Sequence, residues 1–220
     1  MITLDHVRAA LALPGFDPAP AHRLMAPVLT QFPVRPAKTP RSRQAGVLVL
    51  LYPADGLLRF VLTRRSDQLR GHSGQISFPG GRRDPHDASF AAAALREACE
   101  ELGVCDGVTV LGHLAPIYIP PSDFEVFPTV GALAAPPALR PNPDEVAEVF
   151  SVPLAHLLDA RHKREEWRDF SGYQMHVPYY AFNGHKVWGA TATMLSELEH
   201  RLRAVLPADV LAAVTSTSAT

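Results

Sequence analysis

Residues 78–104 read FPGGRRDPHDASFAAAALREACEELGV, and the rest of the chain is organised around this stretch. It opens with a glycine pair after a proline, continues as an alanine-rich segment, and ends with clustered glutamates and a glycine. On a helix that turns about 100° per residue, Glu97, Glu100 and Glu101 fall within roughly 100° of one another. The opposite arc carries apolar side chains: Ala91, Leu95, Ala98 and Leu102. The stretch therefore predicts a helix with one apolar side and one acidic side.

The acidic side of this helix has few compensating charges. Neighbouring carboxylates on a helix repel one another, and Arg96 is the one basic residue close to them. Hard divalent cations such as Mg²⁺ prefer carboxylate oxygens as ligands. The alternative is an exposed acidic face on an ordinary surface helix. The pattern alone does not decide between a metal site and such a surface.

The bulk composition bounds the class of protein. The chain has 220 residues, of which 47% are hydrophobic and 20% charged, an ordinary globular composition. Its net charge of −1 gives no general reason to expect nucleic acid or a membrane surface as a partner. No run reaches the roughly 18 apolar residues of a membrane span, and no signal peptide is predicted. We therefore expect a cytoplasmic protein that binds neither nucleic acid nor membranes.

The cysteines predict no disulfide framework. Cys99 and Cys105 are the only two, and they form no C-x-x-C pair. Cys99 would lie near the apolar arc of the acidic helix. We therefore expect it to be a small buried thiol.

Strand patterns surround the acidic helix. Residues 46–52 (GVLVLLY) form a continuous apolar run, and residues 58–63 follow it across Asp55-Gly56, which predicts a hairpin. Further strands are expected within residues 75–78, 108–119, 125–133, 173–182 and 185–188. Helices are expected within residues 2–13, 21–29, 154–158, 191–206 and 209–214. This order favours an α/β fold with a mixed sheet between helices.

The acidic helix and its flanks resemble the Nudix box, the loop–helix–loop of the Nudix hydrolases. The residues that carry the resemblance are Gly81, Arg96, Glu97, Glu100, Glu101 and Gly103. The segment REACEELGV matches the second half of that box. The first half departs, because Asp87 stands where the box has glutamate and one extra residue separates it from Arg96. We assign no catalytic role to Asp87 and interpret it as a helix N-cap.

Residues 62–81 (LTRRSDQLRGHSGQISFPGG) are similar to the signature of coenzyme A pyrophosphatases within that superfamily. The likeness continues through PPSDFEVFPTVG, PDEVAEVFSVPL and HKVWGATATML, so that it covers about residues 45–200. It implies a Nudix α/β/α sandwich with a mixed β-sheet at residues 44–206. Residues 1–43 are then an N-terminal extension packed on this domain, and residues 207–220 a short helix with a frayed tail.

The resemblance implies hydrolysis of the diphosphate bond of coenzyme A with Mg²⁺ or Mn²⁺ as cofactor. Glu97 and Glu101, one turn apart, are the first choice as metal ligands. Glu100 is the third acid, either a ligand through water or the general base. Gly81 would lend its carbonyl to the metal, because a residue without Cβ allows a close approach of the backbone. Arg96 would pair with a carboxylate of the box and fix its orientation.

The arginine-rich loop before the helix would bind the phosphates of the substrate. Arg65 and Arg70 match positions of the signature and are assigned to the substrate, as is Gly80. Three more arginines could be contacts or solvated surface residues: Arg64, Arg82 and Arg83. Glu145 is a reserve candidate for the general base, against the alternative of an ordinary acid at the start of a helix.

Two other functions remain open at this stage. The same chemistry could act on ADP-ribose or another nucleoside diphosphate derivative. A non-catalytic Nudix-fold module could instead bind a nucleotide or a protein partner. A homodimer is compatible with the sequence, and nothing in the sequence proves it.

Overall fold

The computed structural model describes residues 1–29, 38–39, 41–68, 74–170 and 173–216. Its larger sheet is mixed, because β2 and β8 run parallel while their other neighbours are antiparallel. Within it β5 also pairs with β2, β7 with β8, and β9 with β3. The strands of this sheet are β2 (Arg43–Ala54), β3 (Leu57–Arg65), β4 (Ile76–Ser77), β5 (Gly80–Arg82), β6 (Thr109–His113), β7 (Ile117–Ile119), β8 (Phe124–Ala132) and β9 (Val146–Pro153).

The predicted hairpin joins β2 and β3 at the centre of this sheet. Ala54 pairs with Leu57, which leaves Asp55 and Gly56 as a two-residue turn. Both turn residues have positive φ angles, 51° and 73°, as a tight hairpin whose twist matches its strands requires. Residues 48–51 of β2 are completely buried, because helices cover both faces of the sheet. This double cover explains why the strand reads as a continuous apolar run.

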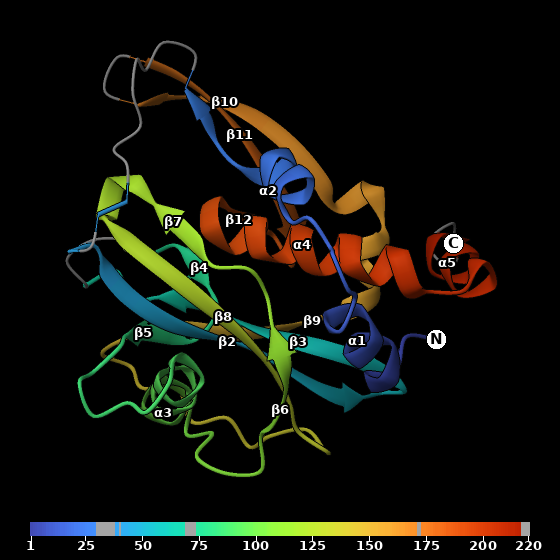
Figure 1. The fold of residues 1–220 in the computed structure, drawn as a ribbon, viewed down its shortest axis with the longest axis horizontal. Coiled ribbons are helices and arrows are strands. Elements are labelled where there is room, and N and C mark those ends of the chain that lie inside the picture. The colour runs from blue at the N-terminus through green and yellow to red at the C-terminus, as the bar shows by residue number, and fades with distance from the viewer. Residues whose placement is uncertain (30–37, 40, 69–73, 171–172, 217–220) are drawn as a thin grey trace.

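Helix α3 (Phe90–Leu102) packs on one face of the sheet, against β2, β5 and β8 (Figure 1). Alternate residues of β2 face it, and Leu48 and Leu50 pack with Ala94, Ala98 and other apolar side chains of the helix. The closest approach lies at Gly46 of β2. A Cβ there would lie 2.3 Å from the carbonyl oxygen of Phe90, so the helix needs glycine at this point.

Helix α4 (Gly189–Val205) covers the other face and lies between the two sheets of the molecule (Figure 1). Val49 and Leu51 of β2 belong to the same apolar core as Leu195, Leu198 and Leu202 of this helix. The smaller, antiparallel sheet lies on the far side of α4. Its strands are β1 (Val28–Leu29), β10 (Lys163–Phe170), β11 (Tyr173–Phe182) and β12 (His185–Trp188).

The remaining elements complete the cover of α4. Helices α1 and α2 pack against it, and α5 contacts the short helix η2. None of the described helices is long and apolar enough to cross a membrane. The bounds are α1 (Leu4–Leu11), α2 (Ala19–Met25), α5 (Ala208–Ser216), η1 (Pro120–Ser122), η2 (Leu154–Leu158) and η3 (Ala160–His162). The α/β class and the sandwich of helix, mixed sheet and helix are those that the sequence predicts.

Three details differ from the prediction. Strand β10 was not predicted, because six of its eight residues are charged and it lies at the edge of the smaller sheet. The helix expected to extend to residue 29 ends at Met25, and residues 28–29 form β1. Helix α4 is not simply amphipathic, because its acids Glu197 and Glu199 are fully buried.

The expectation of a buried free thiol at Cys99 was wrong. Cys99 and Cys105 form a disulfide, with their Cα atoms 4.3 Å apart. Gly103 explains the pairing, because its φ of 71° ends α3 in the left-handed conformation and reverses the chain. The reversal brings Cys105 back beside the last turn of the helix. A spacing of six residues alone does not reveal this turn.

Candidate active site

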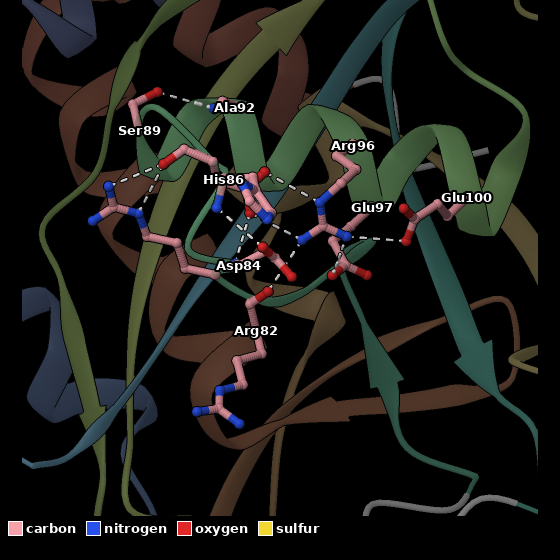
Figure 2. A network of polar contacts seen from close by, with 10 residues as sticks. Arg82, Asp84, His86, Ser89, Ala92, Arg96, Glu97 and Glu100 are labelled. Carbon is pink, nitrogen blue, oxygen red and sulfur yellow. Dashed lines mark hydrogen bonds and ion pairs between the residues drawn. The ribbon is translucent and has the colours of Figure 1, made fainter.

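Helix α3 begins two residues later than predicted. The Ser89 hydroxyl accepts a hydrogen bond from the backbone N–H of Ala92 at 3.0 Å, which makes Ser89 the N-cap (Figure 2). The interpretation of Asp87 as the N-cap was therefore wrong. Asp87 is buried, and its carboxylate accepts hydrogen bonds from the N–H of Asp84 at 2.8 Å and from Arg96. It pairs with the helix from the preceding turn instead of capping it.

Arg96 is the centre of a polar network along the exposed side of α3 (Figure 2). Its guanidinium donates to both carboxylate oxygens of Asp87, at 3.1 and 3.0 Å. It also donates to Glu97 at 2.9 Å and to Glu100 at 3.0 Å. The carbonyl of Arg82 accepts a further bond at 3.1 Å. Hydrogen bonds to Asp87 contribute most to a strong upward shift of the Arg96 pKa, so the charge is permanent. Arg96 thus has the contacts needed to fix the orientation of Glu97.

Three carboxylates converge beneath this network. One carboxylate oxygen from each of Glu97, Glu101 and Glu145 lies within 4.8 Å of the other two. Glu97 and Glu101 lie one turn apart on α3, whereas Glu145 precedes β9. The loop before β9 is attached to the end of the helix, because the N–H of Asn142 donates to the carbonyl of Glu101 at 2.8 Å. A second bond of 2.8 Å, from the N–H of Ser66 to the carbonyl of Glu145, fixes that residue from the other side.

Glu100 lies outside this group. Its assignment as the third acid, a ligand through water or the general base, stays a prediction. Seen along the helix from Glu97, Glu101 lies about 40° to one side and Glu100 about 60° to the other. Glu101 lies on the side of the helix that faces the protein, with 3% of its surface exposed. Glu100, on the other side of Glu97, therefore faces solvent. Its side chain is 52% exposed and is paired with Arg96. The third position is filled by Glu145, which the sequence offered as a reserve base.

Burial dominates the electrostatics of Glu101. Burial, with a smaller upward contribution from the nearby charges of Glu145 and Glu97, raises the pKa of the carboxyl to about 8. The charge of Arg65 and a hydrogen bond from the N–H of Gly80 act in the opposite direction and are too weak to offset burial. Burial also raises the pKa of Glu97 despite its bond to Arg96. Among described residues, Glu101 forms no ion pair within 4.0 Å.

The glycine pair shapes the wall of the site. A Cβ on Gly81 would lie 2.6 Å from the carboxylate of Glu97, so this position admits the acid because it has no side chain. Gly80 has a φ of 155°, and a Cβ there would lie 2.5 Å from the carbonyl oxygen of Gly46. Its N–H is directed at Glu101, so the structure gives Gly80 a positioning contact inside the site. Its predicted contact with substrate remains a prediction.

The arginines assigned to the substrate differ in their surroundings. Arg65 is close enough to Glu101 to lower its pKa, and it pairs across the sheet with Val146, next to Glu145. Arg64 instead forms a two-bond pair with Asp67 at 2.9 and 3.2 Å. Arg70 lies outside the described residues. Arg65 is therefore the assigned substrate arginine that the structure places beside the carboxylates.

The three clustered acids fit a divalent cation. Three carboxylate groups meet there with little compensating charge. Burial disfavours the ionised form of Glu101, so its carboxyl stays neutral near pH 7 unless a cation is supplied. Oxygen ligands of this kind suit Mg²⁺ and Mn²⁺. A cation there would restore the charge of Glu101, and the missing Cβ of Gly81 leaves its backbone accessible. The residues present can therefore hold such an ion.

Known proteins that are similar to this chain belong to one family. Residues 42–171 match the model of the NUDIX domain family. The Nudix hydrolase NudL of Photorhabdus laumondii, itself uncharacterized, is 40% identical over 79% of this chain and 92% of its own length. The human mitochondrial coenzyme A diphosphatase NUDT8 is 38% identical over 78% of this chain and 72% of its own.

A solved structure is similar in fold. The MutT/nudix family protein from Enterococcus faecalis superposes with a TM-score of 0.50 at 15% identity, over 76% of this chain and 64% of its own. This likeness concerns the fold alone.

Proposed function

This chain belongs to the Nudix family, and from that premise we propose that it hydrolyses the diphosphate bond of coenzyme A in a metal-dependent reaction. Water attacks phosphorus, and the products are adenosine 3′,5′-bisphosphate and 4′-phosphopantetheine. The observation that carries the proposal is the group of Glu97, Glu101 and Glu145, in which a buried carboxylate has no cation partner among described residues. A helix that was only an acidic surface would not bury such a group.

The metal would be held by Glu97 and Glu101, with Glu145 and the backbone of Gly81 close by. Bound there, Mg²⁺ or Mn²⁺ supplies neutralisation of the diphosphate charge and a lower pKa for the attacking water. Such a metal ion suits phosphoryl transfer, because catalysis of that reaction is largely positioning and electrostatic stabilisation.

The side chains around the carboxylates have separate tasks in this proposal. Arg96 orients Glu97, and the N–H of Gly80 holds Glu101. Arg65 contacts the oxygens of the substrate diphosphate, for which its planar fork of donors is suited. Glu145 would accept the proton of the attacking water, because its carboxylate lies beside those of Glu97 and Glu101 and comes from the loop before β9. Glu100 is less suited to that task, since Arg96 already engages its carboxylate.

Two observations support coenzyme A as the substrate. The human relative that is named a coenzyme A diphosphatase is 38% identical over most of this chain. Residues 62–81 also carry the signature that resembles coenzyme A pyrophosphatases. ADP-ribose shares the diphosphate and lacks both the pantetheine arm and the phosphate monoester, so it is the most informative competitor.

The test is a comparison of kcat/KM for coenzyme A and ADP-ribose with Mg²⁺, with products separated by chromatography. We expect coenzyme A to be favoured and to give adenosine 3′,5′-bisphosphate. Equal or faster turnover of ADP-ribose would overturn the substrate assignment and leave the metal site standing. Absence of turnover of either substrate, with the nucleotide bound, would support a non-catalytic binding module.

The homodimer and the cytoplasmic location stay predictions from the sequence. Light scattering on the purified chain and fractionation of its cells would test them. The proposed reaction depends on neither, because every carboxylate of the group belongs to one chain.

A further inference from the structure

A cavity of about 780 Å³ opens beside Glu97, and arginines dominate its lining. They come from three parts of the chain: the start of β2, the end of β5, and α3. Against them the lining holds two acids, Asp84 and Glu97. The arginines are Arg41, Arg43, Arg82, Arg83 and Arg96. The cavity is thus strongly basic, although the acid group lies next to it.

Two of these arginines are occupied by the protein itself. Arg96 is bound to Asp87, Glu97 and Glu100, as described above. Arg83 donates to the carbonyl of Asp87 at 3.0 Å and lies over the ring of Phe90 at 4.8 Å. Their task is to support the turn before α3. The carboxylates around Arg96 compensate its charge, and the contacts of Arg83 hold its guanidinium at that turn.

Arg82 is the opposite case. Its side chain extends away from the Arg96 network, and only its carbonyl takes part in that network (Figure 2). Its guanidinium has neither an ion pair nor a hydrogen bond with any residue that the structure describes. Asp84 does not neutralise it, since that carboxylate accepts from the N–H of His86 at 3.0 Å. Arg82 therefore offers its donors to the cavity.

Arg43 is placed to act together with Arg82. Ala45 of β2 pairs with Arg82 of β5, and Arg43 is two residues before Ala45, so Arg43 and Arg82 share one face of the ladder. Such diagonal neighbours lie about 7–8 Å apart at Cα, within reach of two long side chains. Arg43 donates to the carbonyl of Ser122 and lies over the ring of Phe124 at 4.3 Å. These contacts fix the stem and use part of a guanidinium that has five N–H donors.

The position of this pair separates it from the scissile bond. Gly81, between Arg82 and Gly80, lies against the carboxylate of Glu97. Because successive residues of a strand point to opposite faces, Arg82 is turned away from the face that holds the acids. The cavity extends from Glu97 to the arginines and so joins the two places. An anion held by Arg43 and Arg82 would be a different group from the one attacked at the metal site.

We propose that Arg43 and Arg82 form a second phosphate subsite, which binds a phosphate monoester of the substrate away from the scissile diphosphate. The inference rests on the proposed function, under which that group is the 3′-phosphate of coenzyme A. Paired guanidinium forks suit a doubly charged phosphate. The subsite gives the chain a way to favour coenzyme A over ADP-ribose, because a substrate without the monoester leaves both cations unpaired.

The test compares kcat/KM for coenzyme A and 3′-dephospho-coenzyme A in wild type, Arg82→Ala and Arg43→Ala. We expect each variant to lose about tenfold to hundredfold on coenzyme A, the loss of one or two charge-assisted hydrogen bonds, and little on the dephospho form. Arg82→Lys should be intermediate, since it keeps the charge and loses the fork. Arg23→Ala on the exposed side of α2 is the control for a change of net charge. Equal losses on both substrates, or losses on neither, would overturn the subsite.

A binding measurement separates failure of the subsite from failure of the proposed function. Calorimetry would compare adenosine 3′,5′-bisphosphate with AMP on metal-free protein. Tighter binding of the bisphosphate by wild type, lost in Arg82→Ala, would support the subsite even if coenzyme A were not hydrolysed. Equal binding of the two nucleotides by wild type would overturn it even if coenzyme A proved to be the substrate.

Discussion

Helices α3 and α4 cover opposite faces of the larger sheet, and each buries glutamates, but the two groups have opposite surroundings (Figure 1). On α4, Glu197 and Glu199 are fully buried and surrounded by donors. On α3, Glu101 is 3% exposed and receives one backbone hydrogen bond, from Gly80. Burial is nearly equal in the two places, whereas the compensation of charge is not.

The α4 acids show what a structural buried carboxylate looks like. Glu197 accepts from His22 at 2.7 Å, from Arg201 at 2.8 Å and from the N–H of Ala115 at 3.1 Å. Burial raises its pKa, but these bonds outweigh burial, and the pKa lies below its ordinary value. Glu199 is bound by Arg203 of its own helix and by donors on two strands of the smaller sheet, Lys163 and Tyr180.

The comparison teaches how to distinguish the two kinds of buried acid. A carboxylate with a complete set of donors joins elements of the fold, here α2, α4 and the connection between β6 and β7 around Glu197. A buried carboxylate that lacks those donors stays protonated near pH 7 unless a cation is supplied from outside the chain. By this criterion the buried acids of α4 stabilise the fold, and the buried acid of α3 belongs to the candidate active site. The predictions below test that division, from the largest expected effect to the smallest.

Glu101→Gln should reduce turnover by about a thousandfold or more, because it removes a ligand of the metal ion. The ion stabilises the charge that develops in the transition state by several kcal/mol. The fold should survive, since glutamine keeps the shape and can still accept from the N–H of Gly80. The measurements are kcat with Mg²⁺ and the thermal midpoint. Turnover close to wild type would remove Glu101 from the metal site.

Glu197→Gln should have the opposite pair of effects, a loss of stability with activity retained. It should lower the free energy of unfolding by about 3–5 kcal/mol, because it leaves Arg201 buried without its carboxylate. That guanidinium also donates to the carbonyl of Ala10 at 3.4 Å and lies over the ring of Phe16 at 4.2 Å, and neither contact supplies a negative charge. Activity per folded molecule should be unchanged. Urea denaturation measures the first quantity, and a midpoint equal to that of wild type would contradict the structural role.

The stability of the metal-free protein should depend on pH through Glu101. Its pKa of about 8 in the folded chain lies above the ordinary value of 4.5, so the folded state holds the proton more tightly. The associated stability is fully present below about pH 4.5 and is lost as the pH rises towards 8. For one proton the slope is at most about 1.4 kcal/mol per pH unit.

The pH measurement compares wild type with Glu101→Gln by denaturation between pH 5 and about 8.5, a window set by that raised pKa. The difference in stability should move in favour of the variant as the pH rises. The comparison also removes the effect of His156, whose pKa burial lowers and whose protonation opposes folding at low pH in both proteins. A constant difference across the window would show that Glu101 is ionised in the folded chain.

Glu100→Gln should have the smallest effect. Its carboxylate is half exposed, and its pair with Arg96 contributes at most about 1 kcal/mol. We expect kcat to change by no more than about threefold. The variant is the matched control for Glu101→Gln, because it makes the same chemical change one residue away on the same helix. A loss as large as that of Glu101→Gln would return Glu100 to the catalytic group.

Much of the fold could be predicted from local patterns. The apolar run of β2, the Asp55-Gly56 turn and the Asn183-Gly184 turn are signals confined to a few residues, and the structure has strands and turns at each. Strand β10 could not be found in this way, because its charged residues carry no apolar period. Its place depends on pairing with β11, a contact between segments.

The residues of the candidate site also differ in whether local sequence or contacts between distant segments determine their place. Helical spacing puts Glu97 and Glu101 on one side of a helix, and the resemblance to the Nudix box selects them as ligands. The structure brings their carboxylates together. Glu145 could not be ranked above Glu100, because its place depends on two backbone hydrogen bonds from distant residues, Asn142 to Glu101 and Ser66 to Glu145. The disulfide of Cys99 was missed for a similar reason, since it depends on the turn at Gly103.

The most direct test of the central claim is Mg²⁺ or Mn²⁺ binding at pH 7, measured by calorimetry in buffers of different ionisation enthalpy. Wild type should bind the ion and release close to one proton, because Glu101 must give up its proton to become a ligand. Glu101→Gln should bind at least about tenfold more weakly and release fewer protons. Equal affinity and equal proton release in the two proteins would contradict the claim that Glu101 and the acids grouped with it form the metal site.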